Sequence, residues 1–345
     1  MFNKYGNRGN KNKARFEFII RERGWDWAKE AIDKEYQSIL SEGGIAMPDS
    51  VPEGFGGFQA VPPPLGTGEL LPVIGSAGLD PEYERWLETN VREQKQTGYS
   101  VVTVRVSNGN LTGNQMRGLA DISERAGDQL LRFTLDQDVM LGFVPLRNLK
   151  RVYAALKQLN LHAFGAHEIR DVVTCPGAYS CNLALTKTMN LGEALEHTVS
   201  DYEDTRVKRL TIRASGCPNS CGQHWIGDIG FYGNARKIGG KEVPYYQMLL
   251  GGGQDEAGMT RFGMAVQSLP AKLAPTAVRR VLDHYIANRA DGETFREYVL
   301  RHKIETFRAM TADLAKPAEL APEMYRDWGD EEDFSLKLGR GECAA

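Results

Sequence analysis

The chain has 345 residues, and at about 100 to 200 residues per domain this length corresponds to two domains or three small ones. Hydrophobic residues make up 41% of it and charged residues 25%, which excludes wholesale disorder and a collagen-like or low-complexity architecture. The net charge of −3 gives no general attraction to nucleic acid or to an anionic membrane. The longest apolar runs, such as residues 248–250, are far shorter than the roughly 18 residues that cross a bilayer, so no membrane partner is predicted.

The N-terminus and the cysteine count bear on the cellular compartment. Residues 1–6 carry no apolar stretch, small-residue cleavage site or twin-arginine signal, which predicts a cytoplasmic protein. Five cysteines are few and odd in number, unlike the disulfide framework of a secreted protein. Cys343, close to the C-terminus, is expected to be an exposed free thiol, with a mobile active-site thiol as the alternative.

The first 81 residues divide into a helical segment and a connection. Residues 1–42 are predicted to be basic and helical, with helices over 16–20 and 25–40 that are broken near Gly24. Their first 15 residues hold five basic side chains and no acidic one. Residues 43–81 contain nine Gly and seven Pro, which predicts a long irregular linker.

Residues 82–165 are predicted to form a small domain with the order βαββα after a first helix. Its strands are marked by β-branched residues and its helices by apolar periodicity and a threonine cap. A small open sheet with helices on one face is expected. The expected elements are a helix over 82–95, a strand over 99–107, a helix from the Thr112 cap to Ala126, strands over 131–135 and 139–144, and a helix over 146–159.

Residues 166–312 are predicted to form a second domain of mixed strands and helices, so the fold class is α+β. Residues 313–345 are expected to be a loosely packed C-terminal tail. The expected elements of the second domain are strands over 207–214, 226–232 and 245–250, and helices over 183–200 and 275–289.

Four cysteines fall in two short motifs of this second domain. Five residues separate Cys175 from Cys181, and three separate Cys217 from Cys221. Both pairs are expected where a loop enters a helix. Pro218 suits a first helical turn, which would place the second pair on one face. Four converging thiolates suit a [4Fe-4S] cluster, whose irons prefer sulfur ligands.

Three other interpretations of these thiols stay open. Structural zinc fits poorly, because paired zinc ligands usually have two to four residues between them. Two disulfides would need an oxidising compartment that the N-terminus does not indicate. Unrelated buried thiols would not explain two Cys-Pro openings.

The segments at residues 174–184 and 216–223, with Asp-Ile-Gly-Phe at 228–231, resemble the sirohaem and [4Fe-4S] site of assimilatory sulfite and nitrite reductases. The resemblance extends over nearly the whole chain. Residues 5–15 are similar to the segment that joins the two pseudo-symmetric halves of that family. Residues 99–160 are similar to its ferredoxin-like half-domain, and residues 171–310 to its cluster-binding domain. The resemblance therefore implies a ferredoxin-like half-domain over 82–165, a sirohaem/[4Fe-4S] domain over 166–312, and one half of a pseudo-two-fold reductase.

The resemblance also implies roles for individual residues. Cys221, the last cysteine, corresponds to the catalytic thiolate that bridges the cluster to the sirohaem iron, and Asn219 to the residue that lies against the macrocycle. Sirohaem carries eight carboxylates, so its pocket needs cations, and the basic opening is the candidate source. A solvated helix end or a nucleic-acid arm is the alternative for those cations. The implied cluster ligands are Cys175, Cys181, Cys217 and Cys221, and the implied cofactor-contacting cations are Lys11, Lys13 and Arg15.

Some residues near the motifs have two interpretations, and part of the family pattern is missing. Arg213 would face the cofactor or substrate, or pair with a surface acid. His167 and His224 would relay protons or simply pack.

The chain resembles only the second half of the family, whereas the cations that bind the substrate come mostly from the first half. In this half Asp136 and Asp138 stand where an anion site would need cations.

The expected function is the catalytic half of a reductase that carries out six-electron reduction of sulfite to sulfide with electrons from a ferredoxin-like donor. Nitrite reduction to ammonia is the alternative within the family. A complementary half or second subunit would supply the missing cations, or else the chain is a truncated product with an exposed cofactor face. A non-catalytic iron–sulfur electron-transfer subunit and a zinc-stabilised interaction module are the alternatives from other classes.

Overall fold

A computed structural model describes residues 2–6, 16–44, 61–65, 81–254, 258–317 and 320–336 of the chain. The chain divides into two compact units, one of Met1–Gln59 with Gly339–Ala345 and one of Ala60–Leu338. Three predicted cofactor contacts and the last cysteine lie outside the described residues: Lys11, Lys13, Arg15 and Cys343.

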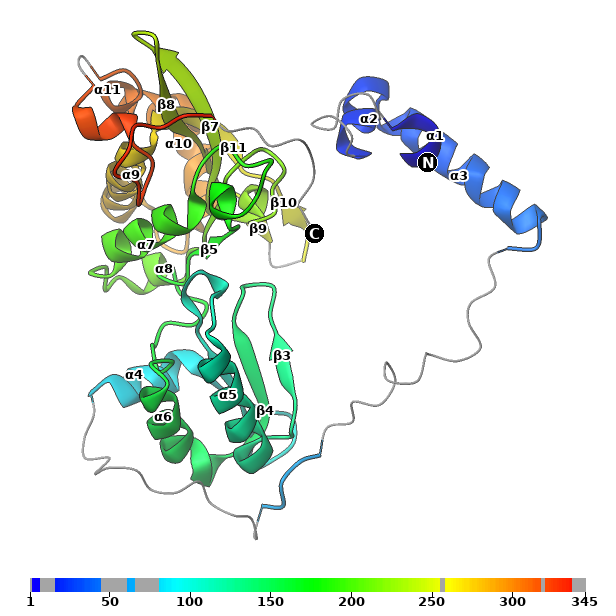
Figure 1. Cartoon of the computed structure of the whole chain (residues 1–345), viewed down its shortest axis with the longest axis vertical. Coiled ribbons are helices and arrows are strands. Elements are labelled where there is room, and N and C mark those ends of the chain that lie inside the picture. Colours follow the sequence, from blue (N-terminus) through cyan, green and yellow to red (C-terminus); the bar gives the residue numbers. More distant parts are fainter. Residues whose placement is uncertain are drawn as a thin grey trace. The chain divides into compact units, whose positions relative to one another are not determined.

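The first unit is a group of helices, α1 (Phe2–Tyr5), α2 (Phe16–Arg23) and α3 (Trp25–Ser41) (Figure 1). The break between α2 and α3 falls at Gly24, whose φ of 85° is a conformation that glycine adopts without strain. Ile19 of α2 and Ala28 of α3 are buried, and Lys4 forms an ion pair with Glu35. The two helices predicted around Gly24 are confirmed.

The second unit begins with a small lobe, defined here as α4 to α6. Its sheet has the order β1-β2-β4-β3, with every neighbouring pair antiparallel. The side chains of Trp86, Leu119 and Val152 come from the three helices and pack with strand residues in one core. The helices therefore cover one face of the sheet, as predicted (Figure 1). The elements are α4 (Pro81–Asn90), β1 (Val91–Glu93), β2 (Tyr99–Val104), α5 (Gly113–Ala126), β3 (Leu131–Phe133), β4 (Val139–Pro145) and α6 (Leu149–Gln158).

The first helix of the small lobe is shorter than predicted. A helix over 82–95 was expected, but α4 ends at Asn90 and the chain continues as β1. Val91 pairs with Val102 of β2, and the Asn90 side-chain amide donates to the Thr103 carbonyl over 2.9 Å. Pairing with a neighbouring strand satisfies the backbone there, so the strand replaces the last helical turn.

The large lobe, defined here as β5 to α11, contains a five-stranded sheet with the order β11-β8-β7-β6-β5. β5, β6 and β7 run parallel, and β8 and β11 are antiparallel to their neighbours. The mixture of sheets and helices confirms the α+β class (Figure 1). The elements are β5 (Val173–Thr174), α7 (Thr188–Val199), α8 (Thr205–Lys208), β6 (Ile212–Ser215), β7 (Ile229–Ile238), β8 (Lys241–Leu250), β9 (Gly253–Gln254), β10 (Thr260–Arg261), β11 (Met264–Pro270), α9 (Ala274–Asn288), α10 (Phe295–Met310) and α11 (Ala312–Ala315).

Several predicted elements of the large lobe begin later than expected. The strand predicted from residue 207 begins at Ile212, because the Asp204 side chain accepts hydrogen bonds from the amides of Arg206 and Val207 and caps the short helix α8. The helix predicted from residue 183 begins at Thr188. The strand predicted from residue 226 begins at Ile229.

The tail was predicted to be loosely packed, and this is wrong for its described part. Asp327 is 1% exposed and accepts a hydrogen bond from the Lys187 amide over 2.7 Å. The Trp328 indole donates to the Ala271 carbonyl over 2.9 Å, and the Lys272 ammonium lies 4.3 Å from the centre of the indole ring. Apolar contact and buried hydrogen bonds thus hold this segment on the large lobe. In the described part of the chain, no helix has the length and apolar composition needed to cross a membrane.

Candidate metal centre

The two cysteine motifs follow two neighbouring parallel strands. Cys175 comes directly after β5, and Cys217 comes two residues after the end of β6. Thr174 of β5 pairs with Ala214 of β6. Because parallel strands end at the same edge of a sheet, both motifs start from one place.

The four thiols lie in one neighbourhood. Burial raises the pKa of Cys217, and the nearby thiols of the other three cysteines raise it further. Cys175 and Cys217 are each 7% exposed, Cys181 is half-buried and Cys221 is exposed. These four cysteines form no disulfide. The structure thus brings together the four residues that the sequence singled out.

Backbone amides point at the two buried sulfurs. The Cys175 sulfur accepts a hydrogen bond from the Gly216 amide over 3.1 Å and another from the Gly177 amide. The Cys217 sulfur accepts one from the Asn219 amide. Burial raises the pKa of the Cys175 thiol, while these amides act in the opposite direction. Fixed N–H donors of this kind stabilise thiolates, the form that binds metal.

The sequence missed the close backbone packing that joins the motifs. The amides of Leu185 and Thr186 both donate to the Gly216 carbonyl, over 2.8 and 3.1 Å. A Cβ on Gly233 would lie 2.0 Å from the Thr186 hydroxyl oxygen, and one on Gly222 would lie 2.0 Å from the Ala214 carbonyl oxygen. Any side chain at these positions would push the segments apart. The only feature of the sequence that indicated this close packing was the position of Gly216 and Gly222 directly beside cysteines.

The local conformation of both motifs differs from the prediction. Cys217 and Cys221 were expected on one face of a helical turn, but Pro218 lies in a non-helical turn and Ser220 has a left-handed φ of 61°. Cys175 is followed only by a single 3₁₀ turn at Gly177–Tyr179. A left-handed residue reverses the direction of the chain, which a continuous α-helix does not allow. The thiols are therefore gathered by turns and not by helix starts.

A single-ion site and a four-iron site differ in ligand spacing. In the part of the chain that the structure describes, no three His, Cys, Asp or Glu side chains gather as a single metal ion requires. Sulfurs around one tetrahedral zinc lie about 3.8 Å apart. A [4Fe-4S] cluster is a larger body that holds one thiolate at each iron. Four sulfurs in one neighbourhood, two of them with amide donors, fit such a cluster.

A string of polar side chains runs from the second motif to the small lobe. The Arg213 guanidinium donates to the Gln223 side-chain oxygen over 2.9 Å and contacts the Asp136 carboxylate at 2.5 Å. The His167 Nδ1 lies 3.5 Å from the other Asp136 oxygen. The hydrogen bond with His167 and the charge of Arg213 lower the pKa of Asp136 to about 2. Of the two interpretations of Arg213, the structure shows the pairing with an acid.

His224 is enclosed by aromatic rings. Its ring centre lies 5.2 Å from that of Trp225 and 5.0 Å from that of Tyr232. The residue is fully buried, and burial lowers its pKa to about 4. Its surroundings therefore favour packing as a neutral imidazole over proton relay.

A cavity of about 530 Å³ lies between the first motif and the C-terminal segment. Cys181 and Tyr179 line one side of it, and acidic side chains of residues 327–333 line the other. Lys187 is bound to Asp330 there by an ion pair. An acidic lining does not suit a macrocycle that itself carries carboxylates.

Gln137 is a contact of the first motif that sequence reasoning did not find. Its side-chain amide donates to the Thr174 carbonyl over 2.6 Å, and its oxygen accepts from the Thr174 amide over 3.2 Å. The small lobe thus holds the residue directly before Cys175. No sequence pattern links two residues so far apart in the chain.

Comparison with known proteins gives a consistent result. Residues 92–159 match the nitrite/sulfite reductase ferredoxin-like half domain, and residues 165–319 match the nitrite and sulphite reductase 4Fe-4S domain. The chain therefore belongs to the nitrite and sulfite reductase family, as its motifs indicated. Membership implies a [4Fe-4S] cluster and sirohaem as cofactors.

Individual relatives carry both sulfite and nitrite names. Sulfite reductase [ferredoxin] of Mycobacterium tuberculosis (strain ATCC 25618 / H37Rv) is 27% identical over 316 residues, covering 89% of this chain and 50% of the relative. The chloroplastic ferredoxin–nitrite reductase of Zea mays is 30% identical over 251 residues, covering 72% and 39%. The structure of the Mycobacterium tuberculosis NirA protein matches with a TM-score of 0.62 at 25% identity, covering 88% of this chain and 50% of that one. The chain spans about half the length of the curated relatives it matches.

Proposed function

We propose that this chain is the cluster-bearing half of a ferredoxin-dependent sulfite reductase, which reduces sulfite to sulfide with six electrons. The observation that carries the proposal is the gathering of four thiols at one edge of the large-lobe sheet. The family membership and the sulfite reductase names of several relatives support it. Nitrite is the alternative substrate, because other relatives are named nitrite reductases.

Cys175, Cys181, Cys217 and Cys221 are the proposed cluster ligands. Cys221 is the most exposed of the four, which leaves its sulfur accessible to a second iron and supports its proposed bridging role. When bound, the cluster and sirohaem would supply one-electron transfer and an iron that binds and reduces the substrate. The amides of Gly216 and Asn219 would hold thiolate charge on the two buried ligands.

The cations that bind the substrate and the sirohaem carboxylates are proposed to come largely from outside the large lobe. Arg213 is already neutralised by Asp136. Lys11, Lys13 and Arg15 are proposed contacts of the sirohaem carboxylates, and Asn219 is proposed to lie against the macrocycle. A complementary reductase half or second subunit is proposed to bring the remaining cations, since relatives are about twice as long. The proposed ferredoxin-like donor rests on the relatives' names.

The test is metal and spectral analysis of anaerobically reconstituted full chain. We expect about four irons per chain in the cluster, with a further iron and visible haem absorption when sirohaem is supplied. Cys221→Ser should lose the spectral coupling between haem and cluster, whereas Cys343→Ser, the matched control outside both motifs, should keep it. A chain that binds zinc but no iron would overturn the proposal.

The substrate and the catalytic role need a separate assay. We expect sulfide formation from sulfite with a reduced one-electron donor, and faster turnover after a complementary half is added. A larger kcat/KM for nitrite would select the alternative substrate. A chain that binds the cluster but no sirohaem, with or without a complementary half, would indicate an electron-transfer subunit. A cytoplasmic location stays a prediction for cell fractionation.

A further inference from the structure

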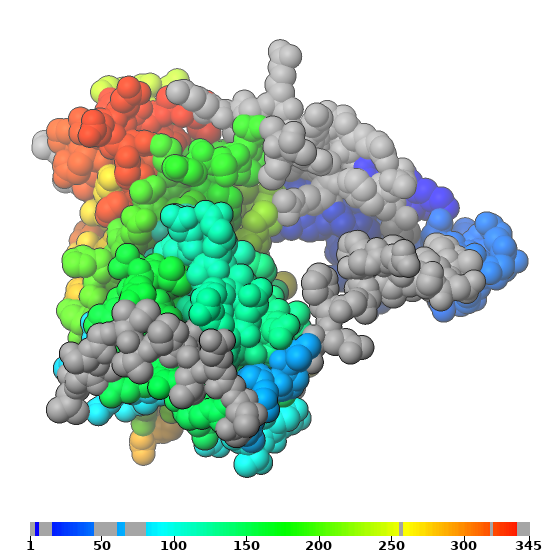
Figure 2. Space-filling view, turned by 60° about the horizontal axis from the view of Figure 1, so that its bottom comes forward, coloured from blue at the N-terminus to red at the C-terminus, as the bar shows by residue number. Residues whose placement is uncertain are grey.

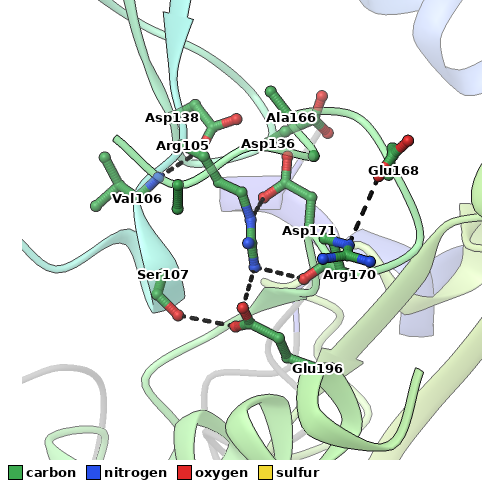
Figure 3. A network of polar contacts seen from close by, with 12 residues as sticks. Arg105, Val106, Ser107, Asp136, Asp138, Ala166, Glu168, Arg170, Asp171 and Glu196 are labelled. Carbon is green, nitrogen blue, oxygen red and sulfur yellow. Dashed lines mark hydrogen bonds and ion pairs between the residues drawn. The ribbon is translucent and has the colours of Figure 1, made fainter. Parts of the chain in front are cut away.

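The joint between the two lobes is built around one buried arginine. Arg105 follows β2 in the small lobe and is 6% exposed. Its guanidinium lies 3.4 Å from the Asp171 carboxylate and 2.5 Å from the Glu196 carboxylate, and it donates to the Arg170 carbonyl over 2.6 Å. Figure 3 shows these contacts, and Figure 2 shows the small lobe, in cyan and teal, next to the green part of the chain that follows it. A single cation beside β2 of the small lobe thus forms ion pairs with Glu196 of the large lobe and with Asp171 in the segment before β5.

A second buried acid comes to this joint from the small lobe. Asp138 is fully buried, and its Oδ1 accepts a hydrogen bond from the Val106 amide over 2.8 Å (Figure 3). Its Oδ2 is also buried, and no described N–H or O–H group donates to it. The Asp171 carboxyl, whose negative charge acts on Asp138, accepts a hydrogen bond from the His167 amide over 2.9 Å and lies 3.4 Å from the Arg105 guanidinium. Two buried carboxyl groups therefore lie near the same arginine.

One proton resolves both difficulties of this arrangement. A bare oxygen without a donor is costly when buried, and two adjacent buried carboxylates repel each other. A proton on Asp138 Oδ2 would form an O–H···O bond to Asp171 and remove one charge. Burial, followed by the neighbouring charge of Asp171, raises the pKa of Asp138 to about 8, and burial also raises the pKa of Asp171. The two groups titrate together, so the proton belongs to the pair.

The position of Asp138 connects this pair to the cysteine motifs. Gln137, the preceding residue, holds both backbone groups of Thr174, and Thr174 directly precedes Cys175. The Asp138 amide also donates a hydrogen bond to the Thr134 hydroxyl over 3.1 Å, which closes the turn. Through the hydrogen bonds of Gln137, the turn at residues 134–138 thus connects the small lobe to β5, the strand that leads to the first motif.

We propose that Asp138 and Asp171 share a single proton, and that this carboxyl pair is a pH-sensitive latch that fixes the turn at residues 134–138 against the strand leading to Cys175. The latch is a property of the protein chain and needs no cofactor, so it is independent of the proposed activity. The charged and titratable groups that face the pair are Arg105 beyond β2, Asp136 in the turn, His167, Glu168 and Arg170 in the segment before β5, and Glu196 on α7.

The direction of the pH effect follows from the proton balance. Unfolded aspartates lose their protons near pH 4, whereas the folded pair keeps one proton up to about pH 8. The folded state therefore binds more protons between these values, and its stability falls as pH rises through this window. Once the shared proton is lost, both carboxyls are ionised, they repel each other, and the latch opens.

Infrared spectroscopy of the full chain tests whether the proton exists. We expect a protonated-carboxyl band at pH 7 that disappears as the pH passes about 8 and that is missing from Asp138→Asn. Asp121→Asn, which removes an exposed acid paired with Arg125, is the matched control and should keep the band. A wild-type spectrum without a band that titrates near pH 8 would overturn the proposal, even if the variant failed to fold.

Hydrogen exchange and denaturation test the latch itself. Asn at position 138 still donates to Asp171 and accepts from the Val106 amide, but it does not titrate. The ratio of wild-type to Asp138→Asn unfolding constants should change tenfold per pH unit between about pH 5 and 8. Amide exchange at residues 172–175, corrected for intrinsic pH dependence, should accelerate above pH 8 in the wild type alone. Parallel pH profiles in the two proteins would refute the latch.

Discussion

Gly222→Ala tests whether backbone contact alone holds the two cysteine motifs together. A Cβ at this position would lie 2.0 Å from the Ala214 carbonyl oxygen, 2.9 Å from the Ala214 carbonyl carbon and 3.0 Å from the Cys175 amide nitrogen. All three are backbone atoms, so no side chain can rotate away. The added methyl group would also part the Cys175 amide from the Ala214 carbonyl, which are now 3.1 Å apart in a hydrogen bond. The first and second motifs would therefore separate.

The size of the effect can be worked from these contacts. Inserting a methyl group into a packed site costs about 1–3 kcal/mol. Losing one backbone hydrogen bond costs about 0.5–1.5 kcal/mol more. We therefore expect Gly222→Ala to lower the free energy of unfolding by about 1.5–4.5 kcal/mol, measured by denaturant titration. Iron uptake in anaerobic reconstitution should fall with it, because the thiols no longer share one place.

Gly113→Ala is the matched control for this substitution. A Cβ on Gly113 would meet only the end of the Arg117 side chain at 3.5 Å, an ordinary contact. Gly113 is the first residue of α5, where alanine is the better helix former, so the variant should be equal to the wild type or up to about 1 kcal/mol more stable. Equal stability of Gly222→Ala and Gly113→Ala, with full iron uptake in both, would refute the reasoning.

Two further substitutions test buried acids away from the cysteines. The Asp128 side chain is fully buried and accepts hydrogen bonds from two Arg132 nitrogens, at 3.1 and 2.6 Å. Arg132→Ala should therefore lower the free energy of unfolding by about 3 kcal/mol in denaturant titration. A loss below about 1 kcal/mol would contradict the role of this pair. Burial raises the pKa of Asp327 to about 6, so the folded state holds its proton longer than the unfolded chain and stability should fall as pH rises from about 4 to 6. The ratio of wild-type to Asp327→Asn unfolding constants should therefore change with pH between about pH 4 and 6, and a ratio that is constant over this range would show that Asp327 titrates normally.

The amino-acid sequence determined the features that depend on near neighbours. The helix Gly113–Ala126 begins as predicted, because Thr112 and Gln115 form a reciprocal capping box that is complete within four residues. The two cysteine motifs and the glycines beside them were also readable, because the spacing of metal-binding thiols is a local property. These features depend on residues that are close together in the sequence and need no distant partner.

Only the tertiary structure decided the features that depend on partners far along the chain. β1 forms because Val91 meets Val102, and the C-terminal segment packs because Asp327 meets the Lys187 amide. The segment around Pro218 is a turn and not a helix, and Ser220 adopts a left-handed φ within it. A buried hydrogen bond or close backbone contact between remote segments leaves no periodic pattern in either segment, so no local pattern could predict it.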